Sequence, residues 1–143
     1  MEFLEWNNKT MSIGIKLIDE QHKELLKIIN KLSISINENS QRKDILTIID
    51  ELIDYGYYHF RTEEELFDKF NYEEADIHVI EHTNFINKFT TIKEKISKNK
   101  MFRDKSSVEV AENIFQYIIN WFLNHVVVSD RKFVPLFKDN GCK

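Results

Sequence analysis

Every histidine in the chain has a position or spacing that suits metal binding. His59 stands four residues before Glu63, and His78 stands four residues before His82. On a helix, this spacing places both side chains of a pair on one face, one turn apart. Imidazole and carboxylate groups are common ligands of transition metals, so the sequence predicts a centre for a pair of metal ions. The predicted ligands are His22, His59, Glu63, His78, His82, His125 and Asp130.

These residues lie on the apolar stripes of four segments. Each segment has apolar residues at the three- and four-residue spacing of an amphipathic helix. The segments span 22–36, 45–67, 75–96 and 111–125. The predicted ligands would therefore point into the core that the four helices share.

The ends of the predicted helices carry recognisable signals. Asp19 is expected to cap the first helix, and Ser106 or Ser107 to open the fourth, because such side chains accept hydrogen bonds from free backbone amides. Residues 37–41 are expected to form a turn, and the polar, basic stretch 98–105 a loop.

Only three glycines and one proline occur in 143 residues, which favours long, uninterrupted helices over a β fold. Four helices of about 20 residues would each be about 30 Å long. Short connections between them favour an all-α, up-down-up-down four-helix bundle. We expect a single domain over 1–143, with an N-terminal arm (1–17), the bundle (18–130) and a short C-terminal tail (131–143).

Asp130 does not fit a regular helix. It follows His125 by five residues, which in an α-helix turns its side chain about 140° away from that of the histidine. A bulge or local unwinding after His125 is needed to bring Asp130 into the core.

The number of predicted ligands indicates which metal they bind. Buried imidazoles and carboxylates cost several kcal/mol unless they are paired or bound to a cation. Two octahedral ions offer about twelve coordination positions. Five histidines, two bridging carboxylates and a bridging oxide or hydroxide fill all but one, which stays free for a small ligand. Ligands without thiolate suit iron, and manganese or zinc less well, since zinc prefers four ligands. We therefore expect two iron ions with a bridging oxide or hydroxide.

Other classes of protein fit the sequence less well. Ferritin-like bundles bind their metals through Glu-x-x-His pairs, and the sequence has none. The net charge of −4 indicates neither nucleic acid nor an anionic membrane as a partner. The single cysteine, Cys142, argues against a disulfide scaffold. With no signal peptide and no apolar run of about 18 residues, we expect a cytoplasmic protein. We also expect it to be a monomer.

Several motifs resemble those of the hemerythrin family, in its single-domain bacterial form. The resemblance extends from Trp6 to Asp130 and covers nearly the whole chain. It rests on the segments Ile13-Gly14-Ile15, Ile18-Asp19-Glu20-Gln21-His22, His59-Phe60-Arg61-Thr62-Glu63-Glu64, His78-Val79-Ile80-Glu81-His82 and Trp121-Phe122-Leu123-Asn124-His125.

The resemblance implies an asymmetric iron pair. His78, His82 and His125 would hold one iron and His22 and His59 the other, while Glu63 and Asp130 bridge both. The iron with two histidines would bind dioxygen and hold it as hydroperoxide. By the same resemblance, residues one turn from the ligands wall the oxygen pocket and exclude water. The residues expected in this role are Leu25, Phe60, Trp121 and Val128.

Two functions follow from these expectations. The first is reversible dioxygen binding for carriage, storage or delivery, with dioxygen as the partner and no catalytic residue. The second is a di-iron peroxidase or oxidase, or a sensor of oxygen or nitric oxide, that uses the same centre. An apolar pocket without an acid or base beyond the ligands favours the first.

Overall fold

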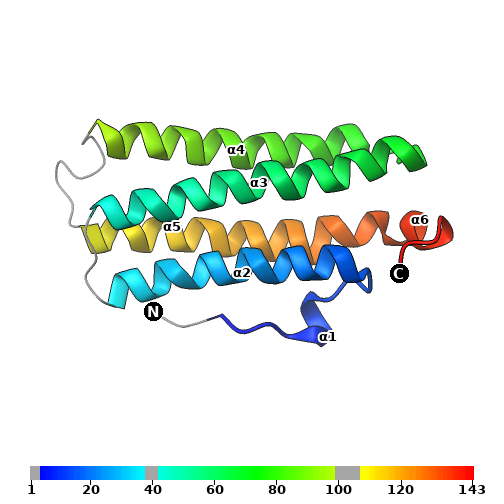
Figure 1. Cartoon of the computed structure of the whole chain (residues 1–143), viewed down its shortest axis with the longest axis horizontal. Coiled ribbons are helices and arrows are strands. Elements are labelled where there is room, and N and C mark those ends of the chain that lie inside the picture. Colours follow the sequence, from blue (N-terminus) through cyan, green and yellow to red (C-terminus); the bar gives the residue numbers. More distant parts are fainter. Residues whose placement is uncertain (1–3, 38–41, 99–106) are drawn as a thin grey trace.

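Four long helices lie side by side and alternate in direction along the chain (Figure 1). The computed structural model describes residues 4–37, 42–98 and 107–143. The long helices are α2 (Lys16–Asn37), α3 (Arg42–Phe70), α4 (Ala75–Ser97) and α5 (Ser107–Trp121). This arrangement confirms the expected all-α, up-down-up-down bundle. Of the expected turn at 37–41, Asn37 is the last residue of α2 and the rest lies outside the described residues, as does most of the expected loop at 98–105.

Shorter elements flank the bundle. The N-terminal arm contains α1 (Asn8–Met11), and the chain after α5 continues as a π-helix, η1 (Phe122–Ser129), a 3₁₀-helix, η2 (Asp130–Phe133), and α6 (Val134–Asp139). The π-helix confirms the predicted departure from regular helix after His125. Within the described ranges, no helix is long and apolar enough to cross a membrane.

The apolar side chains form two core clusters. The larger one fills most of the bundle and includes Leu25, Phe60 and Phe85, whereas the smaller one includes Phe67 and Phe133. Along α3, Phe60 belongs to the larger cluster and Phe67 to the smaller one, so Glu63 lies between the two. The predicted ligands are therefore enclosed by apolar side chains on both sides.

The start of α2 differs from the expectation. The helix begins at Lys16, so Asp19 lies inside its first turn and does not cap it. The Asp19 carboxylate instead accepts hydrogen bonds from the Ser12 hydroxyl (2.5 Å) and the Ile13 amide (2.9 Å). It therefore ties the N-terminal arm to α2, a long-range role that a local capping rule does not foresee.

The end of the chain is more ordered than a short tail. Phe133 and Phe137 are fully buried in the smaller core cluster, and their four-residue spacing places both on one side of the η2–α6 segment. The Lys16 amide donates a hydrogen bond to the Lys143 carbonyl (2.9 Å). The last residues thus close the end of the bundle next to the predicted ligands.

Candidate metal centre

All seven predicted ligands are buried and meet in one place. α2 contributes one of them, α3 two, α4 two, η1 one and η2 one, and each is at most 3% exposed. Their side-chain nitrogen and oxygen atoms form two groups with the spacing of a metal site. The first group is Glu63, His78, His82 and His125, and the second is His22, His59, Glu63 and Asp130.

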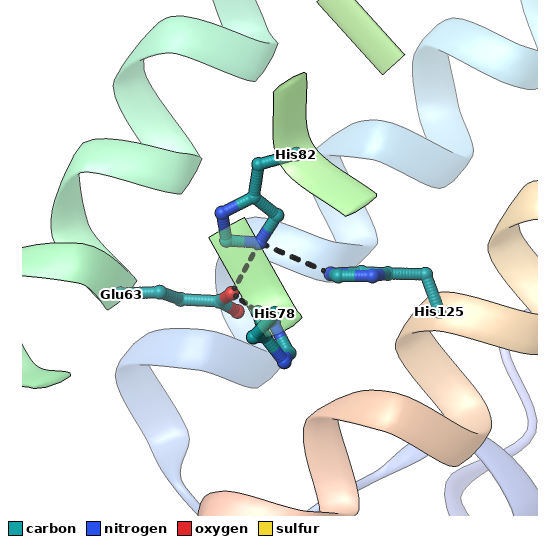
Figure 2. A group of neighbouring side chains, drawn as sticks. All are labelled: Glu63, His78, His82 and His125. Carbon is teal, nitrogen blue, oxygen red and sulfur yellow. Dashed lines mark hydrogen bonds and ion pairs between the residues drawn. The ribbon is translucent and has the colours of Figure 1, made fainter. Parts of the chain in front are cut away.

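Three histidines surround one side of the centre. The Nε2 atoms of His78 and His82 lie 3.2 and 3.1 Å from Oε1 of Glu63. Oδ1 of Asp130 lies 2.9 Å from Nε2 of His78 and 3.1 Å from Nε2 of His125. Figure 2 shows Glu63 of α3, His78 and His82 of α4, and His125 of η1 pointing toward one another. We call these histidines the three-histidine group.

Two histidines surround the other side. Nε2 of His59 lies 3.0 Å from Oε2 of Glu63, and Nε2 of His22 lies 2.9 Å from Oδ2 of Asp130 and 3.8 Å from Oε2 of Glu63. We call His22 and His59 the two-histidine group. Each carboxylate thus directs one oxygen to the three-histidine group and the other oxygen to the two-histidine group.

The π-helix brings Asp130 to this position. Its hydrogen bonds span five residues rather than four, and the Asp130 amide donates to the carbonyl of His125. The residue five positions after His125 therefore returns to the same side of the helix. Both side chains end up buried and face the same centre.

Several buried nitrogen and oxygen atoms of the centre point toward one another without forming hydrogen bonds. Five atoms that face it make no hydrogen bond of acceptable geometry, although several contacts are close to 3 Å. They are Nε2 of His22, Nε2 of His59, Oε2 of Glu63, and both carboxylate oxygens of Asp130. Buried polar atoms are seldom left without partners. Nitrogen and oxygen lone pairs that point at a common centre fit a metal ion between them.

Charges within the centre shift several pKa values. Burial disfavours the protonated imidazole of His22, but contacts with Asp130 and Glu63 outweigh this effect and raise its pKa to about 9. Burial acts in the same way on His125, where Asp130 raises the pKa to about 10. For His59, burial outweighs the attraction of Glu63, and the pKa falls.

The two carboxylates remain ionised. Burial alone would raise the pKa of Glu63 and Asp130, but the neighbouring imidazoles, led by His59 for Glu63 and His125 for Asp130, outweigh it. The pKa of each carboxyl group is therefore well below its usual range. At neutral pH without metal, the protonated imidazoles of His22 and His125, with pKa values of about 9 and 10, would compensate these charges.

Metal uptake is therefore expected to release protons. A metal binds the neutral imidazole, whereas His22 and His125, with pKa values of about 9 and 10, are protonated at pH 7. Ferrous iron added without oxygen at pH 7 should release at least two protons per chain, as measured by an indicator dye in weak buffer. Apparent affinity should rise with pH and level off as the pH passes these two pKa values. Uptake without proton release would contradict the proposed ligands.

Sequence reasoning missed a set of residues that hold the imidazoles from outside. Oε1 of Gln21 lies 2.5 Å from Nδ1 of His59, and Oε2 of Glu64 lies 3.1 Å from Nδ1 of His82. Each neighbours a predicted ligand in the sequence, which is the only signal that could have revealed it. Such contacts hold the proton on Nδ1 and leave Nε2 free for a metal.

Glu81 plays the same part for His125. Its Oε2 lies 3.2 Å from Nδ1 of His125, and its Oε1 accepts a hydrogen bond from the Ser129 hydroxyl (2.9 Å). The contact with His125 lowers the pKa of Glu81, so this residue is ionised at neutral pH. Glu81 therefore connects α4 to both ends of the turn that carries His125 towards Asp130.

Aromatic rings cover the imidazoles. Phe60 stacks on His82 (3.9 Å between ring centroids, 7° between planes), and Trp121 stacks on His125 (4.4 Å, 17°). Two of the expected pocket walls thus lie against the three-histidine group. On the other side, Tyr55 stacks on His59 (5.4 Å, 18°) and donates a hydrogen bond to the Gln21 carbonyl (2.7 Å).

The other two expected pocket walls have different outcomes. Leu25 is fully buried in the larger core cluster, one turn after His22. Val128 is 54% exposed and cannot wall a buried pocket, so this expectation is wrong. It assumed a regular helix, in which a residue three positions after His125 lies close to its face. In the wider π-helix turn it does not, and Val126 is the buried valine of that helix.

Comparisons with known proteins agree with this geometry. A family model described as "Hemerythrin HHE cation binding domain" matches residues 13–137. A bacteriohemerythrin of Stenotrophomonas maltophilia is 26% identical over 138 residues, covering 96% of this chain and 84% of that protein. A bacteriohemerythrin of Clostridium acetobutylicum is 28% identical over 133 residues, covering 90% and 97%.

A solved structure shows the same fold. A crystal structure of wild-type hemerythrin superposes with a TM-score of 0.80 at 22% identity, covering 94% of this chain and 98% of that one. Since the family model also matches most of its length, the chain belongs to the hemerythrin family.

Proposed function

We propose that this protein binds dioxygen reversibly at a pair of iron ions, for carriage, storage or delivery. His78, His82 and His125 would hold one ion and His22 and His59 the other, with Glu63 and Asp130 bridging them. One observation carries the proposal: each buried carboxylate directs one oxygen to each histidine group. That division suits two ions side by side, whereas a single ion would leave one group of imidazoles without a partner.

The ligand types favour iron. The two groups together offer five imidazoles and two carboxylates, and neither group contains a cysteine. This set suits iron better than copper, and it exceeds the four ligands that zinc prefers. A ferrous pair held by these residues would supply the electrons that reversible dioxygen binding needs.

Three side chains next to the two-histidine group, those of Leu25, Phe60 and Tyr55, are apolar or already hydrogen-bonded. Leu25 and Phe60 are buried next to the centre. The Tyr55 hydroxyl already donates its proton to a backbone carbonyl, and burial raises its pKa well above the usual value. Turnover to water or peroxide requires delivery of protons. An apolar enclosure with an engaged phenol therefore favours binding and release over catalysis.

The proposal is tested by a cycle of oxygenation. The protein is loaded with ferrous iron under anaerobic conditions, exposed to oxygen, and then purged, while optical spectra are recorded. Charge-transfer bands that appear with oxygen and vanish on purging, without net consumption of oxygen, support reversible binding. Continuous consumption of oxygen or peroxide in the presence of a reductant would instead show an enzyme.

Replacing Leu25 with asparagine is expected to shorten the half-life of the oxygenated protein several-fold. The amide would draw water towards His22, one turn away, and water promotes the loss of bound oxygen as peroxide or superoxide. The half-life is measured from the decay of the charge-transfer bands. Leu17→Asn on the exposed side of the same helix is the matched control. Equal half-lives in the two variants would count against a protective role for Leu25.

A further inference from the structure

The two histidine groups differ in the side chains that contact Nδ1 of their imidazoles, on the side away from the centre. In the three-histidine group, carboxylates lie against Nδ1 of two members: Glu64 against His82 (3.1 Å) and Glu81 against His125 (3.2 Å). In the two-histidine group, the neutral amide of Gln21 lies against His59. Nδ1 of His22 has no hydrogen-bond partner among the described residues.

Gln21 cannot take the place of a carboxylate in this role. Its Nε2 donates a hydrogen bond to the Thr62 hydroxyl (3.3 Å), which in turn donates to the Tyr58 carbonyl (3.1 Å). This chain of donors fixes the amide with Oε1 towards His59. The His59 imidazole therefore interacts with the dipole of a neutral group rather than with a full negative charge.

A carboxylate that contacts Nδ1 of an imidazole changes the preferred oxidation state of a metal bound at Nε2. It makes the imidazole more basic and places a negative charge close to the metal, which favours the higher oxidation state. Glu64 and Glu81 are 36% and 38% exposed, so solvent screens part of this effect. The imidazoles that they contact are 2% exposed. The unscreened part of the carboxylate's effect would therefore reach the metal through a buried ring.

We propose that Glu64 and Glu81 are positioning residues that make the three-histidine position the more easily oxidised of the two. This inference rests on the proposed di-iron function. The two-histidine position, which has fewer protein ligands, then remains ferrous when one electron is removed from the pair. Dioxygen binding draws an electron from each ion, so the outer carboxylates would help the ion remote from dioxygen to give up its electron.

Three substitutions test the inference through the reduction potential of the iron pair. Glu81→Gln and Glu64→Gln remove a charge from the three-histidine group and should raise the potential. Gln21→Glu adds a charge to the two-histidine group and should lower it. Substitution of such outer partners changes metal affinity by about 10–100-fold. A tenfold change in the preference for ferric over ferrous iron corresponds to about 59 mV for one electron.

The sign of the shift in reduction potential distinguishes an effect of charge from damage to the structure. A merely structural contact would loosen the site in all three variants and shift the potential in one direction. Glu65→Gln and Gln116→Glu are matched controls, because they make the same changes at exposed positions. Both should leave the potential unchanged. Shifts of one sign in all variants, or no shift beyond the controls, would overturn the inference.

A second readout locates the oxidised ion. The protein is loaded with ⁵⁷Fe, one electron per pair is removed with ferricyanide, and Mössbauer spectra are recorded. Wild-type protein should show one ferric and one ferrous site, and Gln21→Glu together with Glu81→Gln should move the ferric signal to the other environment. Failure of the wild-type protein to bind two irons would refute the proposed function. If two irons bind but the Mössbauer spectra of the variants match those of the wild-type protein, only the role of the outer carboxylates is refuted.

A third readout does not depend on iron. In zinc-loaded, ¹⁵N-labelled protein, the Nδ1 protons of His82 and His125 should give downfield signals, as expected of protons that lie against a carboxylate. The His125 signal should move upfield in Glu81→Gln. A His125 signal that stays in place would show that the contact with Glu81 does not polarise the ring.

Discussion

Replacing Glu63 with glutamine is expected to leave the protein unable to hold two irons. Glu63 lies within 3.2 Å of His59, His78 and His82 and is fully buried. The amide nitrogen that replaces one carboxylate oxygen has no lone pair to offer, so one histidine group loses its shared ligand. Substitution of outer partners already costs about 10–100-fold in metal affinity, and loss of a direct ligand should exceed about 100-fold at one position.

Metal content after ferrous loading and gel filtration measures this effect. Wild-type protein should retain two irons per chain, and Glu63→Gln one or fewer, with no charge-transfer band on oxygenation. Glu65→Gln is the control, because it removes the same charge from an exposed residue two positions away. Circular dichroism verifies that the variant is folded. Two tightly bound irons in folded Glu63→Gln would show that this carboxylate does not bridge them.

Removal of iron should lower the melting temperature by more than about 15 °C. A ligand that binds only the folded state stabilises it by about 4 kcal/mol when its concentration is 1,000 times its Kd, so two irons contribute about 8 kcal/mol. For a chain of this size, 1 kcal/mol shifts the melting temperature by roughly 2–4 °C or more. The unsatisfied buried atoms of His22, His59, Glu63 and Asp130 are the reason to expect a less stable fold without metal.

Thermal unfolding followed by circular dichroism checks this expectation. The iron-loaded protein is compared with protein treated anaerobically with a chelator and then dialysed. Reloading the metal-free protein with ferrous iron should restore the higher melting temperature. Equal melting temperatures in the two forms would mean that the metal is not part of the folded core.

The histidine spacing and the apolar stripes were enough to predict the bundle and the place where the predicted ligands meet. Pairs such as His78 and His82 lie on the same stripe as Phe85, so any packing that buries the stripe also brings the imidazoles inside. The spacing of five residues between His125 and Asp130 was informative for the opposite reason. It fits no regular helix, and the π-helix is the structure that resolves the conflict.

The outer partners could not be predicted in the same way. Gln21, Glu64 and Glu81 are ordinary polar residues at positions where a helix commonly faces water. Whether Glu64 on α3 reaches His82 on α4 depends on the distance and rotation between two helices, which no local pattern contains. The expectation that Val128 walls the pocket was wrong because a rule for regular helices was applied inside a π-helix. The expectation that Asp19 caps the first helix was wrong because its hydrogen-bond partners lie in the preceding arm and not in that helix.

Anomalous diffraction at the iron edge from crystals of the iron-loaded protein tests the central claim most directly. The account predicts two peaks in the buried centre, one among His78, His82 and His125 and one between His22 and His59, with both in contact with Glu63 and Asp130. A single peak, or peaks confined to the surface of the bundle, would contradict it.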